Sequence, residues 1–472
     1  MASTRRASLL RGDISLERAL EKEENMIVRL QWPKDKLAFR DYLDDSHHSI
    51  QQIVSHHLGL SRSHLCQISH HSDWIYGGFN VCIPVAVTDS RSRRRFMLRC
   101  PLPYQLGSDI EEKLRCEAAT FEYIRENCPD IPIPYLWGVG LPSGEAFTPL
   151  SQLPLLRRCL EHLRRTFLWL FRKPLPCALS SHPSRYTLSS GYLLMDYIDS
   201  SQGQLLSSVW PDARHDEELR HNFFKSLSRI ILSLGRTPLP RIGSFTLSND
   251  GVLSLTNRPL TLRLPALENE GIPTDIPRDL TYITVDSYLA DILRCHDARL
   301  KLQPNAVNDQ YDAEGQMAVL TIMRALPLTR RDLRHGPFVF HLTDLHPGNI
   351  FVDGQCNIIA VVDLEWGCSL PVEMVSLPYW LTGRYVDMLT GDALDRFNAM
   401  RETFMAVFAQ EEQSYCNRDP TDEQSRTMIM KRAWEIGTYN LFHHHLQPIF
   451  APEQCIDADE EDAKAIPTRF AS

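Results

Sequence analysis

The sequence predicts an α+β protein with a smaller β-rich N-terminal part and a larger helical C-terminal part. Residues 79–100 hold two apolar, β-branched runs of strand length, separated by a polar turn. From about Pro211 onward, helical patterns dominate and are interrupted by a few hairpin signals. The 472 residues allow two or three packed units. Because clefts between such units are common ligand sites, we expect a site between the two parts.

The N-terminal elements follow the order helix, strand, turn, strand, helix. Apolar residues recur at helical spacing over residues 50–60. The first strand, over 79–87, contains Pro84, which favours an edge position because proline cannot donate to a ladder. Residues 94–100 form the second strand. The stretch that follows has a helical period, and four apolar residues share one of its faces: Leu114, Ala118, Phe121 and Ile124.

An insertion over about 141–190 interrupts this pattern. Residues 155–173 predict a basic amphipathic helix, and the Pro- and Ser-rich stretch 174–190 predicts a loop. We expect the apolar side of the helix to pack on the body with its arginines in water, and binding to a membrane surface or an acidic partner is the alternative. A strand follows at 191–198, and a hairpin is expected at 243–255 around an Asn-Asp-Gly turn.

These patterns divide the chain into four predicted segments. The tail is acidic and we expect it to be mobile. The segments are an N-terminal helical or mobile extension (1–60), an N-terminal nucleotide-binding lobe with the helical insert (61–198), a C-terminal catalytic and substrate-binding lobe (199–452) and the tail (453–472).

Composition argues against several classes of protein. The net charge of −9 argues against a general nucleic-acid binder, and the longest apolar runs are too short to span a bilayer. The twelve cysteines form no C-x-x-C pair, which indicates free thiols in a reducing, cytoplasmic compartment. The Arg- and Ser-rich start is similar to a mitochondrial transit peptide, but the acids at Asp13 and Glu17 favour a frayed N-terminus. The oligomeric state is not readable.

The strongest chemical signal lies in residues 341–366, HLTDLHPGNIFVDGQCNIIAVVDLEW. An apolar strand leads to Asp344, and a Pro-Gly loop follows. The Asp-Gly pair at 353–354 predicts a tight hairpin between two apolar runs. This hairpin would bring Asp363 back beside Asn349, so that the three polar side chains gather at one end of a small ribbon.

Two acids and an amide in this arrangement suit phosphoryl transfer. Mg²⁺ takes oxygen ligands from carboxylates, amides and phosphates, so Asn349 and Asp363 are candidate ligands. Asp344 is then available to accept the proton of an attacking hydroxyl. Taken singly, each residue would be an ordinary turn or cap former. The ordered spacing D-x-x-x-x-N, hairpin, apolar strand ending in D favours the catalytic interpretation.

This motif resembles the signature of the aminoglycoside phosphotransferase family, in TDLHPGNIFVD and IIAVVDLEW. The stretches GPFVFHLTDLHPGN, DLEWGCSLPVEM and GYLLMDYI resemble a fungal group in that family, mostly of unknown substrate, and the similarity covers roughly residues 70–400. The resemblance implies a protein-kinase-like two-lobed fold and transfer of phosphate from ATP, with Mg²⁺, to a small-molecule hydroxyl. It implies Asp344 as catalytic base and Asn349 and Asp363 as Mg²⁺ ligands. Glu365 is either a supporting group or an exposed acid.

One position departs from the family pattern. The family usually has histidine two residues before the base, where this chain has Leu342, and His341 stands one place earlier. His341 either bulges into a similar role or is a buried strand residue. The alternative function is therefore a weak or inactive nucleotide-binding pseudokinase that acts as an interaction or regulatory module. A protein kinase is disfavoured, because no A-P-E-like segment follows Asp363 and DLEW replaces D-F-G.

The expected nucleotide side lies earlier in the chain. Gly77 and Gly78 would let backbone N–H groups approach phosphate, although a plain hairpin turn has the same pattern. Resemblance supports the phosphate interpretation and gives Asn80 a supporting role in that loop. Arg99 stands where kinases have a phosphate-binding lysine, and Glu117 is its natural ion-pair partner unless it is an exposed helix acid.

The strand at 191–198 matches the segment that links the lobes in the family. Its alternation would turn Leu194 toward the adenine pocket. Asp196 to Ile198 would present main-chain groups to the base edge. A buried strand without a ligand has a similar pattern.

Overall fold

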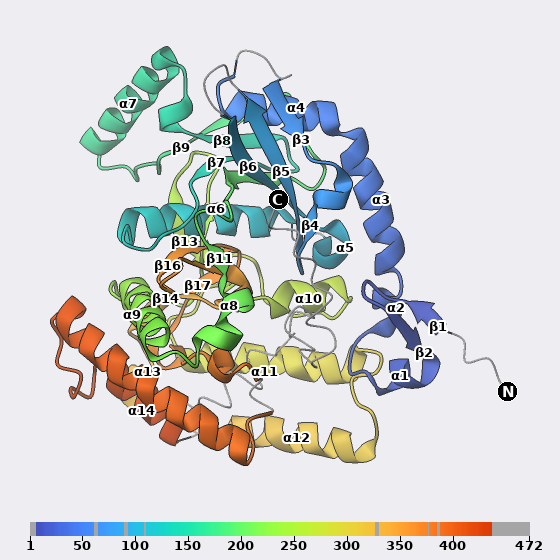
Figure 1. Cartoon of the computed structure of the whole chain (residues 1–472), viewed down its shortest axis with the longest axis vertical. Coiled ribbons are helices and arrows are strands. Elements are labelled where there is room, and N and C mark those ends of the chain that lie inside the picture. Colours follow the sequence, from blue (N-terminus) through green and yellow to red (C-terminus); the bar gives the residue numbers. More distant parts are fainter. Residues whose placement is uncertain are drawn as a thin grey trace.

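The chain is a mixture of α-helices and β-sheets, as predicted. The computed structural model describes residues 6–60, 65–88, 93–107, 110–325, 330–375, 377–384 and 388–436, so the expected acidic tail lies outside the described residues. Figure 1 shows a strand-rich part above a part made mostly of helices. Within the described ranges, no helix combines the length and the apolar content that crossing a membrane requires.

The main sheet of the described chain has eight strands, all paired antiparallel. Its order is β3-β5-β6-β10-β7-β8-β9, and β4 also pairs with β5. The strands are β3 (Cys66–Ile68), β4 (Ile75–Tyr76), β5 (Asn80–Thr88), β6 (Arg93–Pro101), β7 (Leu136–Gly140), β8 (Glu145–Pro149), β9 (Leu179–Pro183) and β10 (Tyr192–Asp196).

Strand β5 is an inner strand, so the edge position predicted from Pro84 is wrong. It pairs with β6 on one side and with β3 and β4 on the other. Ser69 N donates to Pro84 O at 3.0 Å, so the proline main chain faces the β3–β4 side. On that side, β3 pairs with the residues after Pro84 and β4 pairs with residues before it. Pro84 therefore lies in the gap between the two short strands, where no hydrogen bond from its nitrogen is needed.

Two strands lie within the predicted insertion. Residues 174–190 were expected to be a loop, but β9 pairs along its length with β8 at the edge of the main sheet. The serine and proline residues of β9 are typical of loops, so the sequence pattern does not indicate a strand. An edge strand tolerates such residues, because the N–H groups on its outer side need no partner in the sheet. The insertion is therefore partly built into the sheet.

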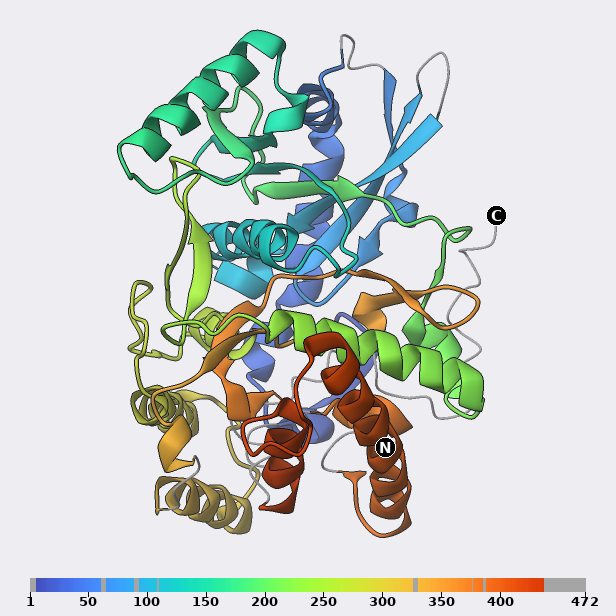
Figure 2. The same cartoon turned by 90° about the vertical axis from the view of Figure 1, so that its left-hand side faces the viewer.

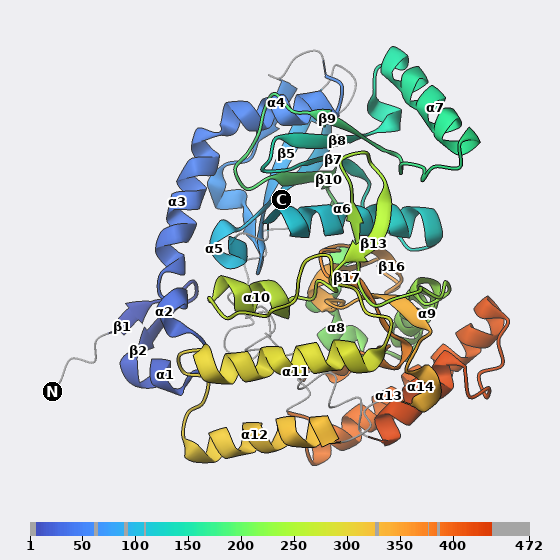
Figure 3. The same cartoon turned by 180° about the vertical axis from the view of Figure 1, so that it is seen from behind.

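Helices cover both faces of the main sheet (Figures 1 and 3). On one face lies α6 (Ile110–Asn127), whose predicted apolar residues are all buried. On the other face, α3 (Trp32–Asp45) and α4 (His47–His57) contribute Phe39, Leu43 and Ile50 to a separate cluster with strand residues of β5 and β6. The sheet thus packs against an apolar cluster on each of its two sides.

The helical part contains short sheets between its helices. Two of them, β14 with β17 and β15 with β16 and β11, carry the 341–366 motif. The helices are α8 (Leu206–Ala213), α9 (Glu217–Leu234), α10 (Arg263–Asn269), α11 (Val285–Leu302), α12 (Gln310–Ala325), α13 (Asp392–Cys416) and α14 (Arg426–Glu435). The strands are β11 (Gln204–Leu205), β12 (Ser244–Leu247), β13 (Leu253–Asn257), β14 (Phe338–Leu342), β15 (Ile350–Val352), β16 (Ile358–Val361) and β17 (Gly367–Pro371). The remaining elements are β1 (Arg6–Ser8), β2 (Asp13–Ser15), α1 (Leu16–Glu21), α2 (Met26–Arg29) and α5 (Pro103–Leu106).

The basic helix of the insertion is α7 (Leu155–Leu170), and the expectation for its packing is wrong. None of its residues is buried, and five of its six leucines, all but Leu168, are exposed. The physical reason is that polar side chains, among them Arg164 and Arg165, bond to the body and turn the apolar side outward. The predicted hairpin at 243–255 is confirmed as β12 and β13.

Candidate active site

Strand β14 delivers Asp344 to the site in a regular register. His341 pairs with Cys368 and Leu342 with Gly367, without a bulge between them. The bulged position considered for His341 is therefore wrong, and His341 is a half-buried residue of an ordinary strand. The loop beyond β14 is anchored by side chains at both ends: Thr343 Oγ1 donates to Trp366 O at 2.9 Å, and Trp380 Nε1 donates to Leu345 O at 3.0 Å.

The predicted hairpin is present as β15 and β16, but its turn is longer than an Asp-Gly pair. Asp353 N donates to Asn357 O at 3.0 Å, so the loop spans 353–357. The Asp353 carboxylate accepts from the main-chain N–H groups of Gln355 and Asn357, each at 2.9 Å. Cys356 takes a left-handed conformation in this loop, with φ of +61°. Asp353 is thus a turn former.

Asn349 ties the Asp344 loop to the return strand. Its Nδ2 donates to Asp344 O at 3.0 Å, and its main-chain O accepts from Val362 N at 2.9 Å. Because the amide nitrogen points at that carbonyl, the amide oxygen points away from it. The chain therefore returns beside Asn349 at Val362, the residue before Asp363, as predicted. The Asp344 side chain is 23 % exposed, which leaves it reachable from solvent.

Asp363 lies two residues beyond β16, in a left-handed conformation with φ of +62°. Aspartate tolerates this region better than most residues, and such backbone positions cluster at functional sites. Its carboxylate forms an ion pair with Arg99 of β6 and is 29 % exposed. One acid of the motif is therefore joined directly to the main sheet.

A buried ion network lies behind Asp363. Arg99 forms the predicted ion pair with Glu117, which is fully buried on α6, so the exposed-acid alternative for Glu117 is wrong. Arg99 Nη2 also lies 3.0 Å from Glu365 Oε2. Glu365 is 2 % exposed, which excludes its exposed-acid interpretation as well. Asn80 Nδ2 donates to Glu365 Oε2 at 2.8 Å, which gives Asn80 a supporting position beneath the Gly77–Gly78 turn.

Lys113 is a member of this network that the sequence interpretation missed. It is fully buried on α6, and its Nζ lies 2.5 Å from Glu365 Oε2 and 3.1 Å from Glu117 Oε2. It also donates to Asn80 Oδ1 at 2.9 Å. The available signal was its spacing of four residues before Glu117, which places both on one helical face.

The surroundings of Asp344 make its carboxylate more basic than that of a free aspartate. Burial raises its pKa well above the usual range, and the nearby carboxylates of Asp363 and Glu365 raise it further, against a smaller opposing effect of Arg99. Electrostatic coupling of this kind requires that the acids lie close to one another. Asn349 links the two acids, because its amide donates to Asp344 O and its main-chain O accepts from the N–H of Val362, the residue before Asp363. That both carboxyl groups open toward one cavity stays a prediction.

His346 faces Asp344 and was also missed. Its Nε2 lies 3.8 Å from Asp344 Oδ1, and its Nδ1 accepts from Gly348 N at 3.1 Å. Because Nδ1 accepts, the proton of the neutral ring sits on Nε2, on the side of the carboxylate. Burial lowers the pKa of His346 to about 4, so the ring stays neutral near pH 7. The signal available in the sequence was a histidine two residues after the acid.

The glycine pair precedes β5 and is exposed. Neither Gly77 nor Gly78 has a positive φ, and a Cβ added to Gly78 would meet nothing within 4 Å. The protein itself therefore does not require glycine at residue 78. A ligand that approaches the main chain closely would require it.

The residues of strand β10 face the opposite sides of the sheet from those that we predicted. Leu194 packs in the α3–α4 cluster, whereas Leu193, paired with Arg99, shares the face of the ion network. The expectation that Leu194 faces an adenine pocket on that side is therefore wrong, because strand neighbours alternate between faces. Asp196 N donates to Tyr135 O at 3.1 Å, and its carboxylate accepts from Trp137 Nε1 at 2.7 Å. Ile198 lies half-buried just beyond this strand.

The acids of the site fit a divalent cation at its outer edge. Glu117, Asp363 and Glu365 place carboxylate oxygens within 4.8 Å of one another. The two glutamates are buried against Arg99 and Lys113, which offset their charge. Asp363 is the partly exposed acid of the three, and the amide oxygen of Asn349 is not the atom that bonds the Asp344 carbonyl, so these two oxygens could serve a cation such as Mg²⁺.

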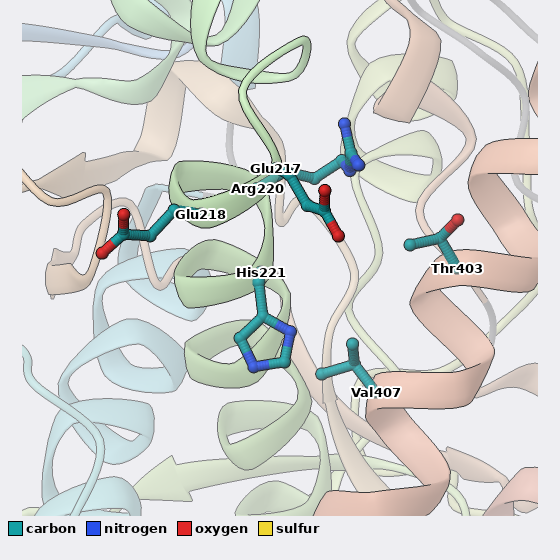
Figure 4. Close-up of a pocket in the computed structure, with 6 residues that line it drawn as sticks. All are labelled: Glu217, Glu218, Arg220, His221, Thr403 and Val407. Atoms are coloured by element: carbon teal, nitrogen blue, oxygen red, sulfur yellow. The ribbon is translucent and has the colours of Figure 1, made fainter.

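A separate cavity lies away from this cluster, between α9 and α13 (Figure 4). It measures about 420 Å³ and contains none of the residues of the ion network. Arg220 and His221 of α9 face Thr403 and Val407 of α13 across it. Its two acids, Glu217 and Glu218, are consecutive in α9 and point to different sides in Figure 4, so we assign the chemistry to the Asp344 cluster instead.

Comparison with known proteins leaves the family open. No protein-family model matches the chain, and no curated protein matches it by sequence. Solved structures that align with it include a candidate fructosamine-3-kinase from Haemophilus somnus 129PT (10 % identity, TM-score 0.30, 84 % of this chain and 97 % of that one), macrolide 2′-phosphotransferase type I (12 %, 0.30, 84 % and 91 %) and spectinomycin phosphotransferase APH(9)-Ia in complex with ADP and spectinomycin (8 %, 0.28, 78 % and 89 %). TM-scores of this size do not establish a common fold, so the assignment below depends on the geometry of the site.

Proposed function

We propose that the protein is a phosphotransferase that moves the γ-phosphate of ATP, with Mg²⁺, to a hydroxyl group of a small molecule. The observation that carries this proposal is the meeting of Asp344, Asn349 and Asp363 beside the buried Arg99–Glu117 ion pair. Phosphoryl transfer asks little covalent chemistry of the protein and depends on positioning and on neutralisation of charge. A reachable acid, an oxygen pair for a cation and a fixed guanidinium are the parts that this task requires.

Asp344 accepts the proton of the acceptor hydroxyl as its oxygen attacks. The loop that carries it is held by the amide of Asn349, and His346 faces its carboxylate. Burial, and then repulsion from Asp363 and Glu365, raise the pKa of Asp344 and make its carboxylate a stronger base than a free aspartate. Its partial exposure gives the acceptor access.

The remaining residues position the nucleotide. Asn349 and Asp363 would hold Mg²⁺, which supplies neutralisation of phosphate charge when bound. Arg99 would provide a fixed positive charge beside the phosphates, at the boundary between the proposed lobes. In this protein-kinase-like arrangement, residues 61–198 form the nucleotide-binding lobe and residues 199–452 the catalytic and substrate-binding lobe.

The test is substitution of Asp344 by Asn. We expect Asp344→Asn to reduce ATP turnover, measured against a broad panel of hydroxyl compounds, by about 10²–10⁴-fold, which is the usual contribution of a general base. Nucleotide binding, measured as the thermal shift with Mg²⁺ and a non-hydrolysable ATP analogue, should be nearly unchanged. The matched control is Asp353→Asn, in the same motif but in the turn, which should retain turnover. Normal turnover by Asp344→Asn would refute the assignment.

A second candidate is a nucleotide-binding pseudokinase that acts as a regulatory or interaction module. Arg99 favours it, because this side chain is 4 % exposed and already contacts three carboxylates, two of them Glu117 and Glu365. A thermal shift with Mg²⁺-ATP, without turnover on any compound of the panel, would favour this candidate. Turnover that Asp344→Asn abolishes would exclude it.

A further inference from the structure

Helix α7 presents an apolar surface to solvent. None of its residues is buried, and eight of the nine bulky apolar side chains of the segment 155–171, all but the half-buried Leu168, are 56–75 % exposed. Because the largest apolar patch on an ordinary monomer is roughly 300–600 Å² and is often functional, a long run of exposed apolar side chains on one helix calls for an explanation. We call this set the α7 apolar surface; its members are Leu155, Leu156, Leu160, Leu163, Phe167, Trp169, Leu170 and Phe171.

Specific polar contacts hold α7 in this orientation. Arg164 Nη2 donates to Asp250 O at 3.2 Å, and Arg165 Nη1 donates to Cys177 O at 3.1 Å. Glu161 Oε1 accepts from a serine hydroxyl of β9 at 3.3 Å. Surface helices usually bury the apolar side and expose the charges. Here charged side chains bond to the body, and the apolar side is turned away from it.

The exposed side of this segment is basic as well as apolar. Residues 155–173 contain six Arg or Lys side chains and one acid, Glu161, which faces the body. The exposed basic residues are Arg157, Arg172 and Lys173. The exposed side therefore carries positive charge without a carboxylate, although the whole chain has a net charge of −9.

We propose that α7 docks the protein onto a lipid bilayer surface that contains anionic headgroups. Helices that lie in the membrane interface combine a broad apolar side with Lys or Arg beside it and with Trp or Phe among the apolar residues. In α7 the apolar surface would enter the boundary of the acyl chains, and Arg157, Arg172 and Lys173 would meet lipid phosphates. Trp169 suits the headgroup level, where an indole keeps its N–H hydrated.

Charge repulsion makes a second copy of α7 a less favourable partner for the α7 apolar surface than an anionic bilayer. Paired in parallel or antiparallel, two such helices would bring Arg157 and the Arg172–Lys173 end of each near like charges of the other. The position of the helix also suits a flat surface. Figures 1 and 2 show α7 at an outer corner of the strand-rich part, apart from the helices of the other part. This inference is independent of the proposed phosphotransferase activity.

The test is co-sedimentation of the full chain with vesicles of phosphatidylcholine, with and without one quarter phosphatidylserine. We expect binding to the anionic vesicles that weakens from about 0.1 M to about 0.5 M NaCl, because salt screens the basic side chains. The triple variant Leu160→Ser, Leu163→Ser, Phe167→Ser should bind at least tenfold more weakly. The charge variant Arg172→Glu, Lys173→Glu should lose about tenfold or more.

A matched control separates α7 from exposed apolar residues in general. Tyr311→Ser, Met317→Ser, Ile322→Ser changes three exposed apolar side chains on α12 and should leave binding unchanged. Because both triple variants alter exposed residues, their melting temperatures should match that of the parent chain. Cys159, exposed on α7, gives a direct probe. A polarity-sensitive fluorophore there, in a Cys416→Ser, Cys455→Ser background, should shift to the blue on anionic vesicles.

Several results would overturn the proposal. These are equal binding to neutral and anionic vesicles, or no binding to either. A concentration-dependent dimer that the α7 triple variant abolishes, without vesicle binding, would assign the surface to a second copy. A fluorophore at Cys159 that is shielded from a soluble quencher without vesicles would mean that the chain itself covers the helix.

Discussion

The buried ammonium of Lys113 offers the sharpest test of the ion network. Lys113→Met keeps most of the side-chain volume and removes the charge between Glu117 and Glu365, whose oxygens lie 3.1 and 2.5 Å from Nζ. Arg99 alone would then face three carboxylates. Removal of one partner from a buried ion pair costs about 3–5 kcal/mol, because the other charge stays buried without compensation. We expect the free energy of unfolding to fall by that amount.

The assay is urea unfolding followed by circular dichroism at pH 7. Lys301→Met, an exposed lysine on α11, is the matched control and should change the unfolding free energy by less than about 0.5 kcal/mol. The double variant Lys113→Met, Glu365→Gln removes an acid together with the cation. Its cost should be smaller than the sum of the single costs by about 1–3 kcal/mol, as expected for contacting charges. A loss below about 1 kcal/mol for Lys113→Met, the range of exposed pairs, would refute the reasoning.

Three further outcomes follow from the structure. Gly78→Ala should leave the melting temperature unchanged yet weaken nucleotide binding. Gly138→Ala should instead destabilise the fold, because its Cβ would lie 2.3 Å from the His57 ring. Melting temperatures measured with and without nucleotide test both variants. His346→Phe should lower kcat and leave the thermal shift with nucleotide intact, because its ring faces the proposed base and not the phosphates. Burial lowers the pKa of His182 to about 4 and that of His57 well below normal, so their stabilising effect is complete above pH 6.5 and is lost as the pH falls toward 4. For His182→Gln, urea unfolding at pH 7 and pH 4.5 should show a pH dependence reduced by about 2–3 kcal/mol; an unchanged dependence would contradict this assignment.

Local pattern was enough to predict the elements that carry the site. β-branched runs identified β5 and β6, and the apolar spacing from Leu114 to Ile124 identified α6. The motif of residues 341–366 predicted a hairpin that returns Asp363 beside Asn349, and the main-chain bond from Val362 confirms that return. These features depend on short-range geometry, which the sequence specifies residue by residue.

The errors concern choices between surfaces, which local pattern does not contain. Pro84 sits in an inner strand because two short strands leave its nitrogen unopposed. Leu194 faces the α3–α4 cluster because alternation sets a period and leaves the phase to tertiary packing. The serine-rich β9 becomes a strand only because the edge of β8 is there to pair with it.

By itself, the sequence determined the mixed α and β class, the order of the main elements and the grouping of Asp344, Asn349 and Asp363, because each depends on neighbours along the chain. Tertiary structure alone decided that Lys113 completes the charge balance behind them, since a buried ion network forms between β6, α6 and the segment after β16. It also decided that α7 turns its leucines outward. Amphipathic spacing shows that a helix has an apolar side, and only the partners of its charged side show which way that side faces.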